Sequence, residues 1–275
     1  MKIFISVDIE GVAGVCEPLQ GQRGNPEYET ARRLMTAEAS AAVRGAFDGG
    51  ASEVIVADSH GPMRNIIADQ LDPRAQLVSG KPRPLSMIEG LRPDHDGIVL
   101  IGYHAAAGER GVLSHTISSQ AFARIRMNGL IVGEPTLFAG HGAEIGVPLL
   151  AASGDDRLCA EVSAQFPAAR TIRTKTALGA QAARSLSPQM AREKISAEVC
   201  AAVSSGRDWP VTPPAAPPLE MEVELMKQIY ADSISLLPFV HRKDARTVAF
   251  EARSCAEAIG ALSVFSLVAM ALTPG

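Results

Sequence analysis

Residues 2–11 read KIFISVDIEG, a largely apolar run that ends in two acids, Asp8 and Glu10. Similar short runs rich in isoleucine and valine occur at residues 53–57 and 97–102. These runs are apolar at nearly every position rather than at alternate positions, which is typical of strands buried on both faces of a parallel sheet. Two carboxylates at the end of such a strand need a compensating charge close by.

A helix is predicted between the first two of these strands. Residues 29–47 are rich in alanine, and the glycines Gly49 and Gly50 that follow are a typical helix stop. A strand, a helix and a strand in this order indicate a right-handed parallel crossover. The predicted fold class is therefore α/β, with an open, mostly parallel sheet flanked by helices and a smaller α+β part at the C-terminus.

The second half of the chain changes character at a proline-rich segment. Residues 210–218, PVTPPAAPP, contain five prolines and predict a stiff linker or strap. Residues 219–226 then alternate apolar and acidic side chains, as in a strand with one solvated face. The other elements predicted here are strands at 147–152 and 247–252 and helices at 159–166, 188–203 and 255–272. We expect a catalytic α/β domain over 1–209 and a βαβα part over 219–275, which could pack together as one unit.

Composition limits the partners and the location of the protein. The 275 residues carry a formal net charge of −4 and no run of Lys or Arg. Nucleic acids and anionic membranes attract clustered positive charge, so neither is an expected partner.

The apolar residues before Asp8 are too few for a signal-peptide core, and the apolar stretch 260–272 is shorter than the about 20 residues that span a bilayer. The four cysteines form no C-x-x-C pair, so we expect reduced thiols and a cytoplasmic protein.

Polar side chains follow each of the first three predicted strands. Asp8 and Glu10 follow the first, His60 in VADSHG follows the second, and His104 in LIGYHA follows the third. Ligands of open α/β sheets bind at the carboxyl ends of the strands, so these side chains should meet at one edge. Two carboxylates at such a short separation repel each other unless a cation lies between them. A metal is the simplest such cation, and these oxygen and nitrogen donors suit zinc best and manganese, cobalt or iron less well.

Each of these residues also has an ordinary structural interpretation. A lone Asp after a strand is more often a helix N-cap, and a lone His in a loop is often simply exposed. Two later residues could complete the site: His115 in GVLSHTIS and Glu134 in LIVGEPTL. His141 is expected to have a packing or loop role, whereas His95 and His241 are expected to be solvated in charged turns.

The motifs SVDIEGVAGV, VADSHG, LIGYHA, SHTIS and VGE, in this order and spacing, resemble the M55 family of metallopeptidases. The likeness extends over most of the chain. It implies a zinc-dependent aminopeptidase that removes the N-terminal residue of short peptides, with D-residues such as D-alanine as candidate substrates. It also implies water activated by a two-metal centre, two zinc ions per subunit, and a homodecamer built from two stacked five-membered rings.

The same resemblance implies roles for individual residues. The implied ligand set is Asp8 as the bridge between two zinc ions, Glu10 and His60 on one ion, and His104 and Glu134 on the other. His115 matches the catalytic residue of the family, described there as the nucleophile; on physical grounds it could equally be a general base or stabilise the tetrahedral intermediate. Pro135 departs from the family pattern and is expected to favour an extended conformation at Glu134.

Two alternative functions remain open at this point. A phosphatase of the haloacid dehalogenase type would use Asp8 as its nucleophile and the pair Asp155–Asp156 as its downstream acids, but it gives no role to His60 and His104. A non-catalytic, ring-forming peptide-binding protein is the second alternative. Such a scaffold has no need for clustered buried charges and should purify without stoichiometric zinc.

Overall fold

The computed structural model describes residues 1–273 and contains a seven-stranded sheet at its centre. Its strands, in spatial order, are β3 (Gln76–Val78), β2 (Glu53–Asp58), β1 (Lys2–Val7), β4 (Gly97–Tyr103), β7 (Leu149–Asp155), β8 (Arg170–Gly179) and β9 (Ala182–Ser185). All neighbouring strands are parallel except β8 and β9. The three apolar runs form β1, β2 and β4, and the mostly parallel sheet confirms the predicted fold class.

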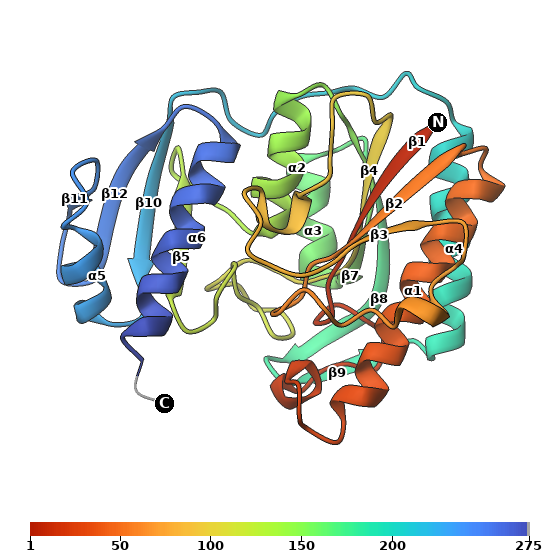
Figure 1. Cartoon of the computed structure of the whole chain (residues 1–275), viewed down its shortest axis with the longest axis horizontal. Helices are drawn as coiled ribbons and strands as arrows, with labels where there is room; N and C mark the ends of the chain where they lie inside the picture. The colour runs from red at the N-terminus through yellow and green to blue at the C-terminus, as the bar shows by residue number, and fades with distance from the viewer. Residues whose placement is uncertain (274–275) are drawn as a thin grey trace.

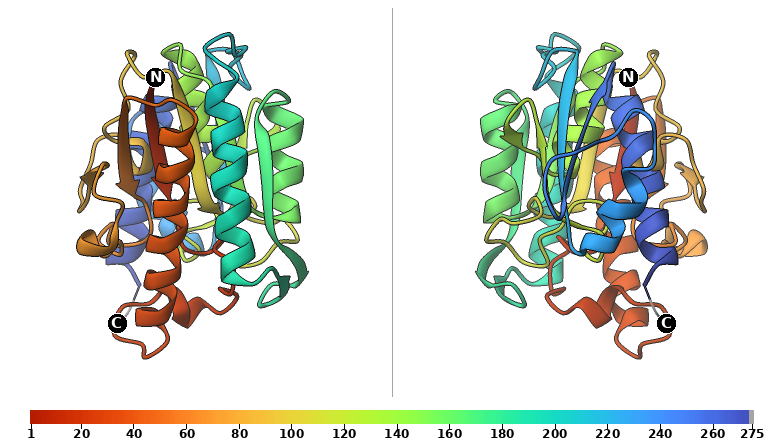
Figure 2. Two further views of the ribbon diagram at one scale, coloured as in Figure 1. Left: turned by 90° about the vertical axis from the view of Figure 1, so that its right-hand side faces the viewer. Right: turned by 90° about the vertical axis from the view of Figure 1, so that its left-hand side faces the viewer.

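Two helices that are far apart in the sequence cover one face of this sheet. α1 (Tyr28–Asp48) and α4 (Pro188–Ser204) lie side by side against it (Figure 1; Figure 2, left). Ile3, Ile5 and Val7, alternate residues of β1, are completely buried in the core beneath these helices. Because side chains alternate along a strand, the residues between them face the opposite side of the sheet.

A second layer of helices and a second sheet cover that opposite side (Figure 1; Figure 2, right). The antiparallel second sheet has the order β11 (His241–Arg242), β12 (Thr247–Ala252), β10 (Leu219–Leu225), β5 (Phe122–Met127) and β6 (Leu130–Ile131). The remaining α-helices are α2 (Glu134–Glu144), α3 (Asp156–Gln165), α5 (Gln228–Ile234) and α6 (Cys255–Ala271), and short 3₁₀ helices lie at Pro18–Gly21, Ala68–Gln70 and Ser86–Ile88. α2 contacts the first sheet and α6 the second, and the two helices contact each other. No described helix is long and apolar enough to cross a membrane.

The proline-rich segment connects the two parts of the molecule. Residues 205–218 contain no helix or strand and run from α4 across the molecule to β10 (Figure 1). The second sheet combines β10 with β5 and β6, which come from the range 1–209. Because one sheet is built from both ranges, we propose that 1–209 and 219–275 fold as a single unit, with the prolines as a strap.

The backbone packs very closely behind the end of β1. The amide of Gly11 donates to the carbonyl oxygen of Gly102 at 2.7 Å, and a Cβ at Gly11 would lie 1.9 Å from the carbonyl oxygen of Tyr103. Gly102 itself has φ +70°, and a Cβ there would lie 2.3 Å from the carbonyl oxygen of Asp8. These two glycines bring the ends of β1 and β4 together, and with them the side chains that follow both strands.

Replacing Gly11 with alanine is therefore expected to lower the free energy of unfolding of the metal-free protein by at least about 1–3 kcal/mol, the usual cost of overpacking. Urea denaturation measures this change. Gly260→Ala in α6 is the control, because a Cβ there meets no atom within 4 Å. It should raise stability by about 0.5–1 kcal/mol, the ordinary gain of alanine over glycine in a helix. Wild-type stability of Gly11→Ala would contradict the close packing.

Candidate metal centre

Six candidate side chains converge at the carboxyl edge of the seven-stranded sheet. They are Asp8 and Glu10 after β1, His60 after β2, His104 after β4, His115 in the loop between β4 and β5, and Glu134 at the start of α2. Adjacent parallel strands end at the same edge, so residues far apart in the sequence meet there. The structure thus brings together every residue of the predicted site, while the role of each residue stays a prediction.

Asp8 lies between two imidazole rings. Its Oδ1 is 3.2 Å from Nδ1 of His60, and its Oδ2 is 3.3 Å from Nε2 of His104. Each of these histidines also faces a second acid. Glu10 Oε2 is 3.0 Å from His60 Nδ1, and Glu134 Oε2 is 3.3 Å from His104 Nε2. The arrangement consists of two halves that share the carboxylate of Asp8.

Backbone carbonyl groups fix the tautomers of the histidines. A carbonyl oxygen can only accept, so the ring nitrogen facing it carries the hydrogen. His60 Nε2 faces the carbonyl oxygen of Gly21 at 2.8 Å, and His104 Nδ1 faces that of Ala105 at 3.1 Å. In the neutral ring the other nitrogen then carries the lone pair and faces carboxylate oxygens, which are also acceptors, so a proton or a metal ion is needed between them. Second-sphere bonds of this kind are typical of histidines that bind metals.

His115 is held in the same way. Its Nδ1 donates to the carbonyl oxygen of Leu113 at 2.9 Å, and its Nε2 lies 3.9 Å from Glu134 Oε1. The ring stacks on His104 with 4.0 Å between centroids. Glu134 Oε1 also accepts from the amide of Ile117 at 2.7 Å. The loop thus orients both its own histidine and the carboxylate of Glu134.

The donor set matches a divalent cation. Oxygen and nitrogen atoms of Asp8, Glu10 and His104, and those of His104, His115 and Glu134, form two groups within 4.8 Å. His104 Nε2 and Glu134 Oε2 are buried without a hydrogen-bond partner. A cation between facing lone pairs satisfies both atoms, and carboxylate with imidazole is a ligand combination that suits zinc. The residues present therefore fit a metal.

The electrostatic surroundings of the same residues favour positive charge at the same place. Burial lowers the pKa of His104, but the charge of Glu134 and the contact with Asp8 outweigh it and raise this pKa well above the usual value. Burial also lowers the pKa of His60, but the charge of Glu10 and the contact with Asp8 outweigh it and raise this pKa well above the usual value. Burial raises the pKa of Asp8, yet the two histidines hold it well below the usual range. The carboxylates around each imidazole thus favour a positive charge there, carried by a proton or by a bound metal ion.

A large cavity opens over the cluster. Its volume is about 890 Å³, and Asp8, Glu10, His60, His115 and Glu134 line one side of it. On another side it is lined by one stripe of α6, namely Ser263, Ser266, Leu267 and Met270. His104 lies beneath this surface, only 1% exposed. The cavity is large enough for a short peptide, and α6 lines it with two hydroxyl-bearing and two apolar side chains.

Strained backbone gathers around this cavity. Within residues 1–273, the non-glycine residues with positive φ are Met63, Ser86, Leu113, Ile117 and Asn128, and all but Asn128 line the cavity. Such conformations cost about 1–3 kcal/mol each and persist where the surrounding structure enforces them. Leu113 and Ile117 flank His115, so the strain lies in the segment that aims the imidazole.

A half-buried acid beside the centre has no signal in the sequence. Glu161 of α3 accepts hydrogen bonds from the amides of Ala106 and Gly133, at 3.2 and 3.0 Å, and from Thr136 Oγ1. Burial raises the pKa of Glu161 to about 7, although these bonds oppose the shift. It ties the loop after His104 to the start of α2. An isolated glutamate in a helix carries no sequence signal for such a role.

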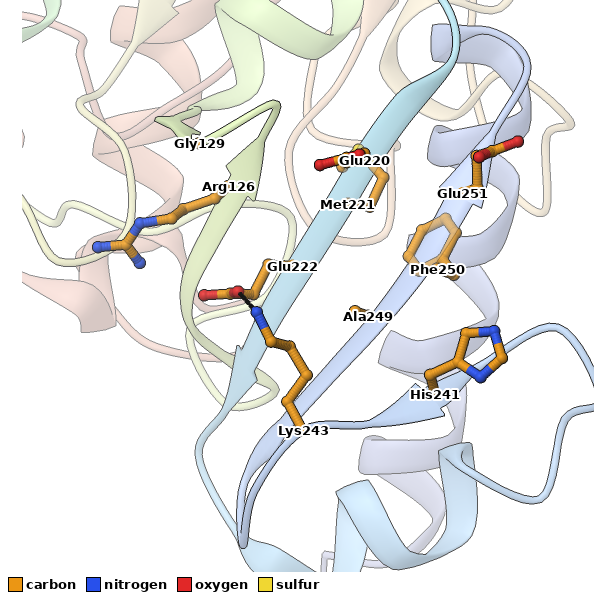
Figure 3. Close-up of a pocket in the computed structure, with 10 residues that line it drawn as sticks. All are labelled: Arg126, Gly129, Glu220, Met221, Glu222, His241, Lys243, Ala249, Phe250 and Glu251. Carbon is orange, nitrogen blue, oxygen red and sulfur yellow. Dashed lines mark hydrogen bonds and ion pairs between the residues drawn. The ribbon is translucent and has the colours of Figure 1, made fainter.

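Three other histidines lie outside the centre. His141 is buried in α2 near Glu144, in keeping with a packing role. His241 is exposed as predicted and lines a separate cavity of about 330 Å³ on the five-stranded sheet, beside the Glu222–Lys243 ion pair (Figure 3). The prediction for His95 was wrong: it is 6% exposed, because its ring packs edge-on against Phe4.

The expectation for Pro135 was also wrong. Glu134 is not extended but is the first residue of α2, and Pro135 occupies the first turn of that helix. Proline is well tolerated there because its missing N–H has no partner within the helix at that position. Pro135 therefore helps to start α2 at the point where Glu134 enters the centre.

Comparison with known proteins gives one consistent result. The family model Peptidase_M55, described as D-aminopeptidase, matches residues 1–264. A D-aminopeptidase of Bacillus subtilis (strain 168) is 35% identical over 272 residues, which cover 98% of both chains. The solved structure of the Zn-dependent D-aminopeptidase DppA from Bacillus subtilis, described as a self-compartmentalizing protease, matches with a TM-score of 0.94 and 32% identity over the full length of both chains.

Proposed function

The chain belongs to the M55 family of peptidases, and we propose that it is a zinc-dependent aminopeptidase that removes the N-terminal residue from short peptides, with D-residues such as D-alanine preferred. The observation that carries the metal part of this proposal is the pair of histidine ring nitrogens that face the two carboxylate oxygens of Asp8. A phosphatase that uses Asp8 as its nucleophile is not favoured, because both oxygens of that carboxylate already face imidazole nitrogens.

The proposed ligand set follows from the two halves of the centre. Asp8 would hold both zinc ions, Glu10 and His60 one of them, and His104 and Glu134 the other. When bound, zinc would polarise the scissile carbonyl group and increase the acidity of water. Supporting this set, four of the five proposed ligands have a further hydrogen bond that holds their orientation. For example, the amide of Ile117 donates to Glu134, and the ring of His60 donates to the carbonyl oxygen of Gly21.

His115 has the geometry of a proton carrier rather than of a structural residue. Its Nδ1–H is engaged with Leu113, so Nε2 is left as the basic atom, and the residue lines the cavity. We propose that Nε2 accepts a proton from the attacking water and returns it to the leaving amine, which is general acid–base chemistry. The same position would allow the protonated ring to stabilise the tetrahedral intermediate.

A homo-oligomer is part of the same proposal. The related DppA is described as self-compartmentalizing, and we propose a homodecamer for this chain as well. Native mass spectrometry of the purified protein measures the subunit number directly. We also propose a cytoplasmic location, which agrees with its four free cysteines.

Metal analysis combined with substrate comparison tests the function. The purified protein is expected to contain two zinc ions per subunit, to lose activity with a chelator, and to regain it with added zinc. It should hydrolyse D-alanine amide and D-alanine dipeptides faster than the L-isomers when both are measured side by side. Protein without stoichiometric metal would favour the scaffold alternative. Equal rates on both isomers would retain the aminopeptidase and reject the D-preference.

A further inference from the structure

A lysine is buried beneath the loop that carries Asp8 and Glu10. Lys175 belongs to β8, and only 2% of its surface is exposed. Burying an ammonium group is costly unless its hydrogens find acceptors. In residues 1–273, Lys175 forms no ion pair with a carboxylate, and all of its hydrogen bonds go to backbone carbonyl groups. This pattern indicates that the ammonium group of Lys175 holds the backbone of the loop in place.

The ammonium group of Lys175 donates all of its hydrogen bonds to the loop that follows β1. Lys175 Nζ donates to the carbonyl oxygens of Glu10, of Val12 at 3.1 Å and of Val15 at 2.5 Å. An ammonium group has three donors, so each of its hydrogens has one acceptor in residues 10–15. A neutral side chain of similar length could not gather these carbonyl groups around one point.

Two neighbours hold the same loop. Oγ1 of Thr174, the residue before Lys175, shares its hydrogen between the carbonyl oxygens of Gly11 at 2.8 Å and Gly154 at 3.0 Å. Glu38 of α1 also holds the loop, because its carboxylate accepts from the amide of Ala13 at 2.9 Å. Backbone groups of every residue from Glu10 to Ala13 are thus fixed by side chains from distant elements. The path of the loop directly after β1 is set by these bonds.

We propose that Lys175, assisted by Thr174, is a positioning residue of the metal centre: it holds residues 10–15 so that Asp8 and Glu10 turn their carboxylates toward the same cation. This inference rests on the proposed function, since it concerns the ligand loop of the zinc centre.

Lys175→Met tests the proposal, because methionine keeps the length of the side chain and removes the three donors. Metal-free wild type and variant are titrated with cobalt(II), and the visible absorption of the bound cobalt reports the geometry of its ligands. Zinc affinity is measured by competition with a chelating dye. We expect a cobalt spectrum altered in shape and a zinc affinity lowered about 10- to 100-fold, the usual effect of losing an outer-shell partner.

A second variant and a control make the result decisive. Thr174→Val removes the hydroxyl that bonds the carbonyl groups of Gly11 and Gly154, and it leaves the three bonds of Lys175 in place. It should shift zinc affinity and the cobalt spectrum in the same direction by a smaller amount, and it decides the question if Lys175→Met does not fold. Lys194→Met removes the same charge from the exposed side of α4 and should leave both readouts at wild-type values.

The possible failures are distinguishable. If Lys175→Met and Thr174→Val lower only the thermal midpoint of the metal-free protein and bind metal as the wild type does, the two residues are merely structural and the inference is overturned. A wild-type protein that takes up neither cobalt nor zinc contradicts the metal centre itself, and with it the inference.

Discussion

Replacing Asp8 with alanine is expected to remove both zinc ions and reduce peptide hydrolysis to background. The two oxygens of this carboxylate face different histidines, His60 and His104, at 3.2 and 3.3 Å. Its loss therefore weakens both halves of the centre at once, whereas loss of Glu10 or Glu134 would weaken one half. Metal content by mass spectrometry, together with the rate of D-alanine amide hydrolysis, measures the two effects.

Two further variants make this result specific to Asp8. Asp8→Asn keeps the size of the side chain but presents an N–H₂ donor on one side, so we expect it to retain at most one zinc ion. Glu109→Gln changes an exposed acid that lines the same cavity and should keep both ions. Retention of two zinc ions by Asp8→Ala would contradict the shared-ligand role, and loss of a single ion would assign Asp8 to one half.

The framework of the site could be predicted from the sequence because it depends on strand ends. Buried parallel strands are recognisable as short apolar runs, and parallel strands end at one edge, so polar residues after β1, β2 and β4 had to meet. Asp8, His60 and His104 are adjacent for this reason. Their position follows from topology alone, without knowledge of side-chain conformations.

Other features depend on contacts that sequence does not encode locally. The sequence of β5, FARIRM, does not read as a strand because charged residues occur along it. Only the sheet that β5 joins shows that these residues lie on its outer face and that the other face is apolar. Lys175 and Glu161 are single charged residues in ordinary elements, and their roles arise from the loops that pack on them. His95 is buried because the strand of Phe4 lies beside its turn, which no local pattern reveals.

His115→Ala is expected to keep both zinc ions while lowering turnover at least about a hundredfold, the usual effect of removing an acid–base group. The ring lines the cavity, and its Nε2 lies farther from Glu134 than His104 Nε2 does, 3.9 against 3.3 Å. His104, His115 and Glu134 nevertheless form one group of potential ligands. Measuring zinc content and turnover on the same preparation separates the two roles: loss of zinc from the variant would make His115 a ligand.

His115→Gln then separates the two forms of catalysis. The glutamine amide can donate a hydrogen bond to a developing oxyanion but cannot accept a proton from water. If His115 is a general base, the glutamine variant should be as slow as the alanine variant. If it stabilises the tetrahedral intermediate, glutamine should recover much of the lost turnover. Because Leu113 holds Nδ1 and leaves Nε2 basic, we expect the first outcome, with both variants retaining zinc.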